Sequence, residues 1–325
     1  MHKQQYGTTL IELMVALAIG SFLIIGAVQI YNQSRQAFVI NESIARVQET
    51  AQFAMDIVES DIRMSSNWGR TSRSLSIEGR SLSGNANPNS LTVPTDCGAQ
   101  WVLDLGLPVD GDNNTYALGC DPTGTAMANS DVLTVRRASV TPTADATLLN
   151  GKLYVQSTRI QGDIVVGDGS TLVPVPVDAS DPSTHNLMIS SYYVATDSTL
   201  IPGTPSLRRK ILQMNGGSMS IIDEEVAPGV ENLQVQFGVD LDQDNTVDRY
   251  VNPGDEVYDP LASGYVPGAR VMTARIWMIV RASRIEVGIQ DDRSYEPGDR
   301  DLGTPTDSFR RMQISKTILL RNSLI

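Results

Sequence analysis

The chain has 325 residues, of which 41% are hydrophobic and 19% are charged. This composition is typical of a folded globular protein and excludes an intrinsically disordered one. The formal net charge of −12, from 25 basic and 37 acidic residues, argues against a general nucleic-acid-binding surface, because such a surface needs basic patches to neutralise phosphates.

The first predicted element is an apolar segment that begins after Gly7 and continues to about Ile30. About 20 mainly apolar residues can cross the hydrocarbon core of a bilayer, so we predict a membrane-spanning helix over residues 8–30. Glu12 is the one carboxylate inside it. A carboxylate in a membrane helix costs roughly 2.5–3.5 kcal/mol on insertion scales and usually marks a function. An ordinary N-terminal membrane anchor is the alternative interpretation.

The residues around Gly7 carry a resemblance to a known family. The first seven residues, followed by Thr8-Thr9-Leu10-Ile11-Glu12, resemble the type III signal of the type IV pilin superfamily. The resemblance implies that residues 1–7 are a leader, that a membrane peptidase cleaves after Gly7, and that it methylates the new amino terminus at Thr8. It also implies that Glu12 takes part in assembly into a filament. The family usually has an apolar residue where this chain has Thr8, which weakens the methylation inference more than the cleavage inference.

Beyond Tyr31 the sequence becomes amphipathic, with apolar residues at spacings of three and four that form one stripe on a helix. No proline occurs before Pro88 to interrupt it. We therefore predict one continuous helix from Thr8 to about Met64, roughly 85 Å long, with residues 31–66 as its amphipathic part. The stripe is expected to pack on a head domain, and a coiled coil is the alternative. Its members are Ile40, Ile44, Val47, Ala51, Ala54, Val58 and Ile62.

From residue 67 to residue 325, short β-rich segments alternate with loops rich in Gly, Pro, Asp and Ser. This pattern predicts a mainly antiparallel β head. With the long helix it gives an α+β, pilin-like fold shaped as a lollipop, and a cluster of prolines suggests a subdivision near residue 180. The expected strands are Ser90–Val93, Asp131–Val135, Lys152–Val155, Asp163–Val166, Leu187–Ala195, Ser206–Asn215, Met219–Glu225, Glu231–Val239, Arg270–Ala282 and Phe309–Arg321.

Two cysteines, Cys97 and Cys120, lie in a polar, turn-rich stretch of the predicted head. In an exported bacterial protein, two cysteines most simply form one disulfide. Closing a loop of this size stabilises a fold by roughly 3 kcal/mol in the chain-entropy model. We expect the bridge, and two unpaired thiols are the alternative.

An acidic segment after the predicted strand Glu231–Val239 places carboxylates at positions 1, 3, 5 and 9. Alternating carboxylates can fold around a hard cation, and Ca²⁺ accepts six to eight oxygens. Position 6 is Asn245 rather than glycine and position 12 is Val251 rather than glutamate, so one ligand would come from elsewhere. A solvated acidic turn is the alternative, and Asp110–Asn114 is a weaker echo of the pattern. The predicted Ca²⁺ ligands are Asp240, Asp242, Asp244, Thr246 through its carbonyl, and Asp248.

Signals of catalysis are weak throughout the sequence. One of its two histidines, His2, falls in the predicted leader, and the other, His185, lies in a turn-like segment where a surface histidine is expected. There is no Gly-x-Ser-x-Gly elbow and no His/Cys cluster of the kind that binds zinc. We predict that the chain is not an enzyme.

Segments in the C-terminal half indicate which branch of the pilin superfamily the chain resembles. Phe237–Asp240, Val271–Arg281 and Phe309–Asn322 are similar to PilW-type minor pilins. The resemblance implies a low-abundance subunit, anchored in the inner membrane with a periplasmic head, that enters a type IV pilus, primes its assembly and sits at its tip. The pilus would serve twitching motility, attachment or DNA uptake.

The same resemblance implies the partners. They would be the prepilin peptidase, the inner-membrane assembly machinery, the major pilin, other minor pilins and a tip adhesin. Two alternative functions stay open: a J-type minor pseudopilin of type II secretion, and a membrane-anchored adhesive binding module.

Overall fold

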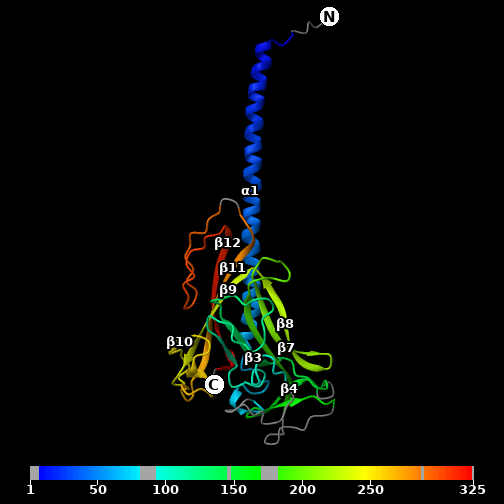
Figure 1. The fold of residues 1–325 in the computed structure, drawn as a ribbon, viewed down its shortest axis with the longest axis vertical. Coiled ribbons are helices and arrows are strands. Elements are labelled where there is room, and N and C mark those ends of the chain that lie inside the picture. The colour runs from blue at the N-terminus through cyan, green and yellow to red at the C-terminus, as the bar shows by residue number, and fades with distance from the viewer. Residues whose placement is uncertain (1–6, 81–92, 145–147, 170–181, 287–288, 324–325) are drawn as a thin grey trace. The chain divides into compact units, whose positions relative to one another are not determined.

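The structure is a computed structural model that describes residues 7–80, 93–144, 148–169, 182–286 and 289–323. The chain divides into two units, Met1–Arg46 and Val47–Ile325, and the second contains the β head (Figure 1). Three sequence predictions fall wholly or mostly outside the described residues. They are the leader before Gly7, the strand at Ser90–Val93 and the boundary near residue 180.

The predicted long helix is present as α1, Leu10–Arg63, which has 54 residues. It is the one helix among the described residues that is long and apolar enough to cross a membrane, with a mean hydropathy of 2.4 in its most apolar window. Its end is marked by Ser66, whose φ of 58° is a left-handed conformation that cannot continue a helix.

Within Val47–Ile325, α1 buries the lower part of the predicted stripe. Val47, Ala51, Ala54, Val58 and Ile62 are all buried, because spacings of three and four residues place them on one helix face. That face packs on the chain's own head rather than on a second helix. Each fully buried Val or Ile side chain stabilises the fold by roughly 1.5–3 kcal/mol, so this face fixes the end of α1 to the sheets.

The larger sheet has eight strands in the order β1-β5-β4-β6-β3-β2, with β7 paired to β6 and β8 to β7. Its long strand β6, Ser183–Ala195, pairs antiparallel with β4, β3 and β7 along successive parts of its length. The pairing of β1 with β5 is parallel, and the other pairings are antiparallel. The remaining strands are β1 (Ile77–Glu78), β2 (Val109–Asp112), β3 (Val132–Ala138), β4 (Leu153–Ser157), β5 (Gly162–Val166), β7 (Ser206–Asn215) and β8 (Ser218–Pro228).

The smaller sheet has four antiparallel strands in the order β10-β9-β11-β12. Its register pairs the last residue of β9, Asp240, with the first residue of β11, Arg270. The loop that follows β9 is therefore held beside the start of β11. The strands are β9 (Val230–Asp240), β10 (Arg249–Val251), β11 (Arg270–Ile285) and β12 (Phe309–Leu319).

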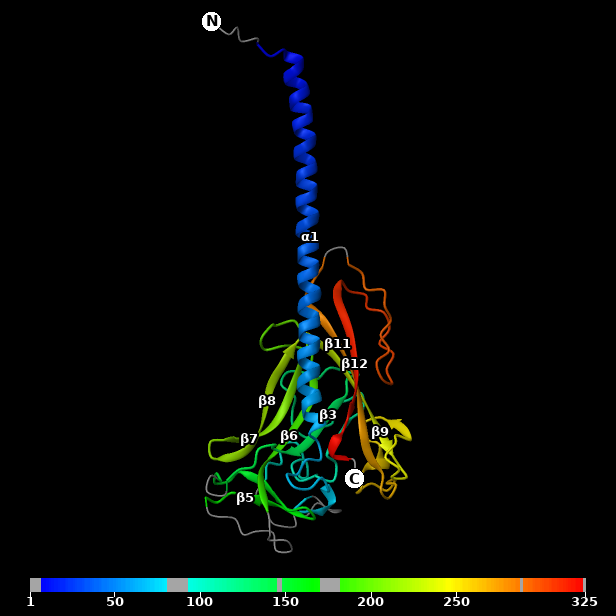
Figure 2. The same cartoon turned by 180° about the vertical axis from the view of Figure 1, so that it is seen from behind.

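One hydrophobic core joins the end of α1 to both sheets. It combines Met55 and Ile62 of α1 with Tyr192 of β6, Phe237 of β9 and Ile276 of β11. Figure 2 shows strands of the larger sheet on one side of this part of α1 and β11 and β12 on the other. Because the helix end and both sheets share this core, we expect them to fold cooperatively.

One sequence interpretation is wrong in its local structure, because His185 is not a surface residue in a turn. His185 lies in β6 with its side chain 5% exposed, Nδ1 is 2.7 Å from the Ser139 carbonyl oxygen, and Nε2 is 2.8 Å from Ser183 Oγ. The segment Asp110–Asp112, where the sequence has the weaker echo of the acidic pattern, is part of strand β2. Gly111 allows this pairing, because a Cβ there would lie 1.8 Å from the Val132 carbonyl oxygen.

Candidate functional site

The predicted processing and assembly residues lie at the start of α1. Gly7 and Thr8 are exposed and precede the helix, which begins at Leu10. Thr9 N donates a 2.9 Å hydrogen bond to Glu12 Oε2, and Glu12 N donates one of 3.3 Å to Thr9 Oγ1. This reciprocal pair is a capping box, which satisfies two backbone donors at a helix start.

The capping box gives Glu12 a local partner within its own chain. Its carboxylate also lies at the positive end of the helix dipole, where an anion is favourable. The sequence reasoning missed this role, although the signal was present: Thr9 followed three residues later by Glu12, before an apolar run, is the spacing of a capping box.

Two acidic residues near the end of α1 bind one sheet each. Asp61 accepts hydrogen bonds from Arg137 Nη2 of β3 at 2.8 Å and from the Tyr192 hydroxyl of β6 at 2.6 Å. Glu59 forms an ion pair with Lys316 of β12. Burial and the nearby Asp61 carboxylate raise the pKa of Tyr192 far above its usual range, so its hydroxyl stays a donor.

Cys97 and Cys120 form a disulfide, with their Cα atoms 4.2 Å apart, in agreement with the pairing expected from the sequence. Cys97 is buried in a second hydrophobic cluster that also contains Trp68 and Trp101. The Tyr116 hydroxyl donates a 2.6 Å hydrogen bond to the Cys120 carbonyl. The bridge therefore joins the connection before β2 to the connection after it.

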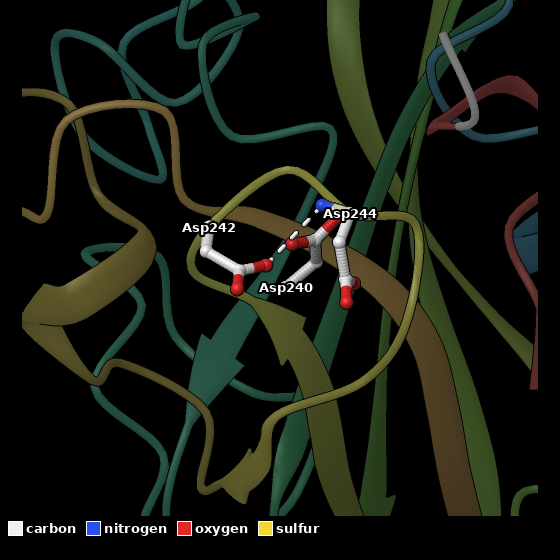
Figure 3. A group of neighbouring side chains, drawn as sticks. All are labelled: Asp240, Asp242 and Asp244. Carbon is white, nitrogen blue, oxygen red and sulfur yellow. Dashed lines mark hydrogen bonds between the residues drawn. The ribbon is translucent and has the colours of Figure 1, made fainter.

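The structure brings three of the predicted metal ligands together. Asp240, Asp242 and Asp244 each place a carboxylate oxygen within 4.8 Å of the others, at the end of β9 and in the loop that follows (Figure 3). The loop is tight because Gln243 and Asn245 have φ values of 66° and 69°. Asparagine is one of the few non-glycine residues that tolerate this conformation, so Asn245 can replace the glycine of a calcium loop.

Protein groups already bind the innermost carboxylate. Asp240 is fully buried, its Oδ1 accepts from Gln243 N at 2.7 Å, and its Oδ2 accepts from Asn245 N at 3.0 Å and from Arg270 Nη2 at 2.9 Å. Burial raises the pKa of Asp240, but Arg270 and the two backbone donors outweigh it and hold the pKa below its usual value. Asp240 is thus a charged anchor of the loop.

The other predicted ligands differ in position. Asp242 and Asp244 are exposed, and Asp244 Oδ1 accepts from Thr246 N and Thr246 Oγ1, each at 2.7 Å. Asp248 is not in the group of three, and its Oδ2 accepts from Leu241 N at 2.7 Å. Three clustered carboxylates suit a hard cation, whereas the Arg270 guanidinium supplies a positive charge that opposes one.

Family models match both ends of the chain. Residues 191–322 match the family described as type IV pilus-assembly protein W, and residues 2–28 match the prokaryotic N-terminal methylation motif. These two matches support a PilW-type pilin. The PilW match begins within β6 and includes all four strands of the smaller sheet. The pilin family is a structural one, whose prepilin motif implies processing by a peptidase and assembly with other pilins.

A comparison with solved structures finds a similarity to a type IV-like pilin from Thermus thermophilus. The two sequences are 12% identical, and the TM-score is 0.30 over 67% of this chain and 84% of that chain. A comparison with curated proteins finds no match. The family assignment of this PilW-type pilin rests on the two sequence matches.

The prepilin motif and α1 together give the location of this PilW-type pilin. The motif matches residues 2–28, and the apolar window of α1 is long enough to cross a bilayer. The protein is anchored in the inner membrane by its N-terminal helix and carries a β head.

Proposed function

We propose that this PilW-type pilin is a minor pilin that is cleaved after Gly7, inserted in the inner membrane and incorporated into a type IV pilus. The observation that carries the proposal is the register of Gly7 and Glu12 at the start of an apolar helix. The side chains of α1 in this region are exposed, so they need lipid or neighbouring pilins around them.

Cleavage after Gly7 creates an amino terminus at Thr8, four residues before Glu12. In the isolated chain the Glu12 carboxylate accepts the Thr9 N–H. In the filament it compensates the positive amino terminus of a neighbouring subunit, an attraction that is stronger in the apolar interior than in water. A subunit without that partner leaves a carboxylate poorly compensated in hydrocarbon, so pairing favours ordered assembly.

The position of this subunit in the filament follows from a role in starting pilus assembly. A subunit that starts a filament is added before the others and therefore ends at the tip. The tip position would bring the β head into contact with surfaces during motility or attachment. A normal filament that fails to attach when the protein is deleted would instead favour a purely adhesive role.

Mass spectrometry of the N-terminus, from membranes and from sheared pili, tests the proposal. We expect a mature chain that begins at Thr8 in both fractions, and the same measurement reports whether Thr8 is methylated. A chain that retains residues 1–7 in membranes, or one that never appears in sheared pili, would contradict the proposal.

We also propose that the loop from Asp240 to Asp248 binds Ca²⁺ weakly. The clustering of Asp240, Asp242 and Asp244 supports it. Calcium sites of extracellular modules have dissociation constants of roughly 10⁻⁴–10⁻³ M. Because Arg270 already neutralises Asp240, we expect a dissociation constant in this range or larger.

A further inference from the structure

Two Asn-Gly pairs lie in turns of the larger sheet, and their backbone contacts differ. Asn215-Gly216 ends β7 and starts the turn to β8 (Figure 2), and Asn150-Gly151 lies in the turn before β4. Both asparagines are exposed. An Asn-Gly pair can lose ammonia spontaneously, because glycine has no Cβ to hinder attack by its backbone nitrogen on the asparagine amide. The contacts of that nitrogen therefore decide which pair reacts.

The glycine nitrogen of the first pair is available for this attack. Gly216 N donates no hydrogen bond to any of the described residues. Asn215 pairs with Ser218 in the last register position of β7 and β8, and the end of such a ladder opens easily. A Cβ at Gly216 or Gly217 would have no heavy atom of the described residues within 4 Å beyond its chain neighbours. A ring between Asn215 Cγ and Gly216 N therefore has room to close.

The glycine nitrogen of the second pair is already engaged. Gly151 N donates a 2.7 Å hydrogen bond to the Gly167 carbonyl oxygen, and Lys152 N donates one of 3.1 Å to the Leu149 carbonyl oxygen. Gly151 N must break its bond before it can lose its proton and attack, and breaking that bond costs free energy. The same dipeptide is therefore protected at one turn and unprotected at the other.

We propose that Asn215 is a site of spontaneous deamidation and that the hydrogen bond of Gly151 protects Asn150. A base in solvent takes the proton of Gly216 N, and the nitrogen forms a bond to Asn215 Cγ. The Cγ–Nδ2 bond then breaks and ammonia leaves, which gives a succinimide. Water adds to either carbonyl carbon of the ring and yields aspartate or isoaspartate. The reaction consumes only water, and the proposal does not depend on pilus assembly.

Either product changes the tip of the β7–β8 hairpin. A carboxylate replaces a neutral amide at an exposed position, and isoaspartate also places an additional methylene in the backbone before Gly216. The pairing of residue 215 with Ser218 then loses its register. The surface at this tip should therefore change with the age of the protein.

Peptide mapping by tandem mass spectrometry tests the site, after incubation of the purified full-length protein at mildly alkaline pH. Asn215 should be converted roughly threefold to tenfold faster than Asn150, the range expected for one backbone hydrogen bond. The rate should rise with pH, because Gly216 N must lose its proton, and isoaspartate should be among the products. In concentrated urea the two asparagines should react at similar rates, because Gly151 no longer donates to Gly167.

A variant of the second turn tests the protection directly. A Cβ at Gly167 would lie 2.3 Å from the Leu149 carbonyl oxygen, so Gly167→Ala should disturb the hydrogen bond of Gly151 and accelerate conversion of Asn150. Gly169→Ala is the matched control, because a Cβ there would have no heavy atom of the described residues within 4 Å beyond its chain neighbours. It should leave Asn150 slow.

Three results on the unmodified protein would overturn the proposal, whether or not the variants fold. They are equal rates for Asn215 and Asn150 in the folded protein, a faster reaction at Asn150, and conversion of Asn215 only in urea. Aspartate without any isoaspartate at position 215 would exclude the succinimide route. An unchanged rate at Asn150 in folded Gly167→Ala would show that Gly167 does not protect it.

Discussion

The Tyr192 hydroxyl of β6 donates a 2.6 Å hydrogen bond to Oδ2 of Asp61 in α1. The other oxygen of Asp61 accepts from Arg137 Nη2 at 2.8 Å. Both carboxylate oxygens are therefore used, although the residue is only 5% exposed. The two donors compensate the burial of this charge at the junction of helix and sheet, so loss of the carboxylate would leave them without their acceptor.

Asp61→Ala should destabilise the head by roughly 3–5 kcal/mol, because it leaves the Arg137 guanidinium and the Tyr192 hydroxyl without their partner in a buried site. Urea unfolding of the full-length protein in detergent, followed by near-UV circular dichroism, measures the change. Glu42→Ala is the control, since Glu42 pairs with Arg46 on an exposed face of the same helix and should cost less than about 0.5 kcal/mol. Equal losses of stability in the two variants would contradict the prediction that the buried contacts of Asp61 stabilise the head.

Glu12→Ala should leave cleavage and membrane insertion intact and reduce the amount of protein in sheared pili. Glu12→Gln separates the two roles of this side chain, because its amide oxygen can still accept from Thr9 N while its charge is lost. If charge drives assembly, Glu12→Gln should behave as Glu12→Ala does. Immunoblots of membrane and sheared-pilus fractions give the comparison.

Thr9→Val serves as the control for the cap. It removes the Thr9 Oγ1 acceptor at the start of α1 but keeps the Glu12 carboxylate, so pilus incorporation should be close to that of the unmodified protein. If the Glu12→Ala variant appears in sheared pili in normal amounts, Glu12 has no role in assembly.

Deprotonation of the buried Asp131 carboxyl group should lower the stability of the head as the pH rises. Burial raises its pKa to about 7, against the opposing effect of hydrogen bonds from Asn114 N and Val235 N. Because the folded-state pKa lies above that of the unfolded chain, the contribution of this residue is fully present below about pH 4 and is lost as the pH rises through 7. The loss is at most about 4 kcal/mol.

Thermal melts of the full-length protein between pH 4 and pH 8 check this effect. Asp131→Asn should flatten the decline in melting temperature with pH, although it lowers stability overall by weakening one of the two backbone hydrogen bonds. Asp291 does not interfere in this range: Arg293 holds its pKa at about 2, so its contribution is lost only in stronger acid. An unchanged slope in Asp131→Asn would contradict the prediction.

Millimolar Ca²⁺ should raise the melting temperature of the full-length protein if the acidic loop binds it. Asp242→Asn should abolish the increase, whereas Asp292→Asn, an exposed residue outside the loop, should not. Arg270→Gln should tighten calcium binding, because it removes the guanidinium that pairs with Asp240. No increase in the unmodified protein or in Arg270→Gln would identify the loop as a solvated turn fastened by Arg270.

Much of the fold could be predicted, because the helix and most strands are marked by local patterns. The bounds of β7 equal the predicted Ser206–Asn215, and α1 ends one residue from the predicted Met64. Strand β2 was missed because Asp110 and Gly111 are typical of turns, and only the pairing with β3 makes this segment a strand. Ser183–Asn186 also resembles a turn, and its pairing with β4 extends β6 through it.

The candidate sites also divide into those formed by residues close together in the sequence, which could be predicted, and those formed by distant residues, which could not. The Thr9–Glu12 capping box and the Asp240–Asp244 cluster are formed within a few residues, so their spacing in the sequence reveals them. The partners of Asp61 lie 76 and 131 residues away along the chain. Arg270, which decides the electrostatics of the acidic loop, is likewise 30 residues from Asp240. Such pairs depend on strand order and register, which single-sequence patterns do not specify.

The two ion pairs near the end of α1 have a mechanical consequence. Glu59 bonds to Lys316 in one sheet and Asp61 bonds to Arg137 in the other, so a pull on the helix is shared between two sheets. These bonds lie within one turn of the helix, so a load along its axis reaches them together rather than one after another. Rupture then requires simultaneous failure of both attachments and of the core beneath them, which makes this junction resistant to tension.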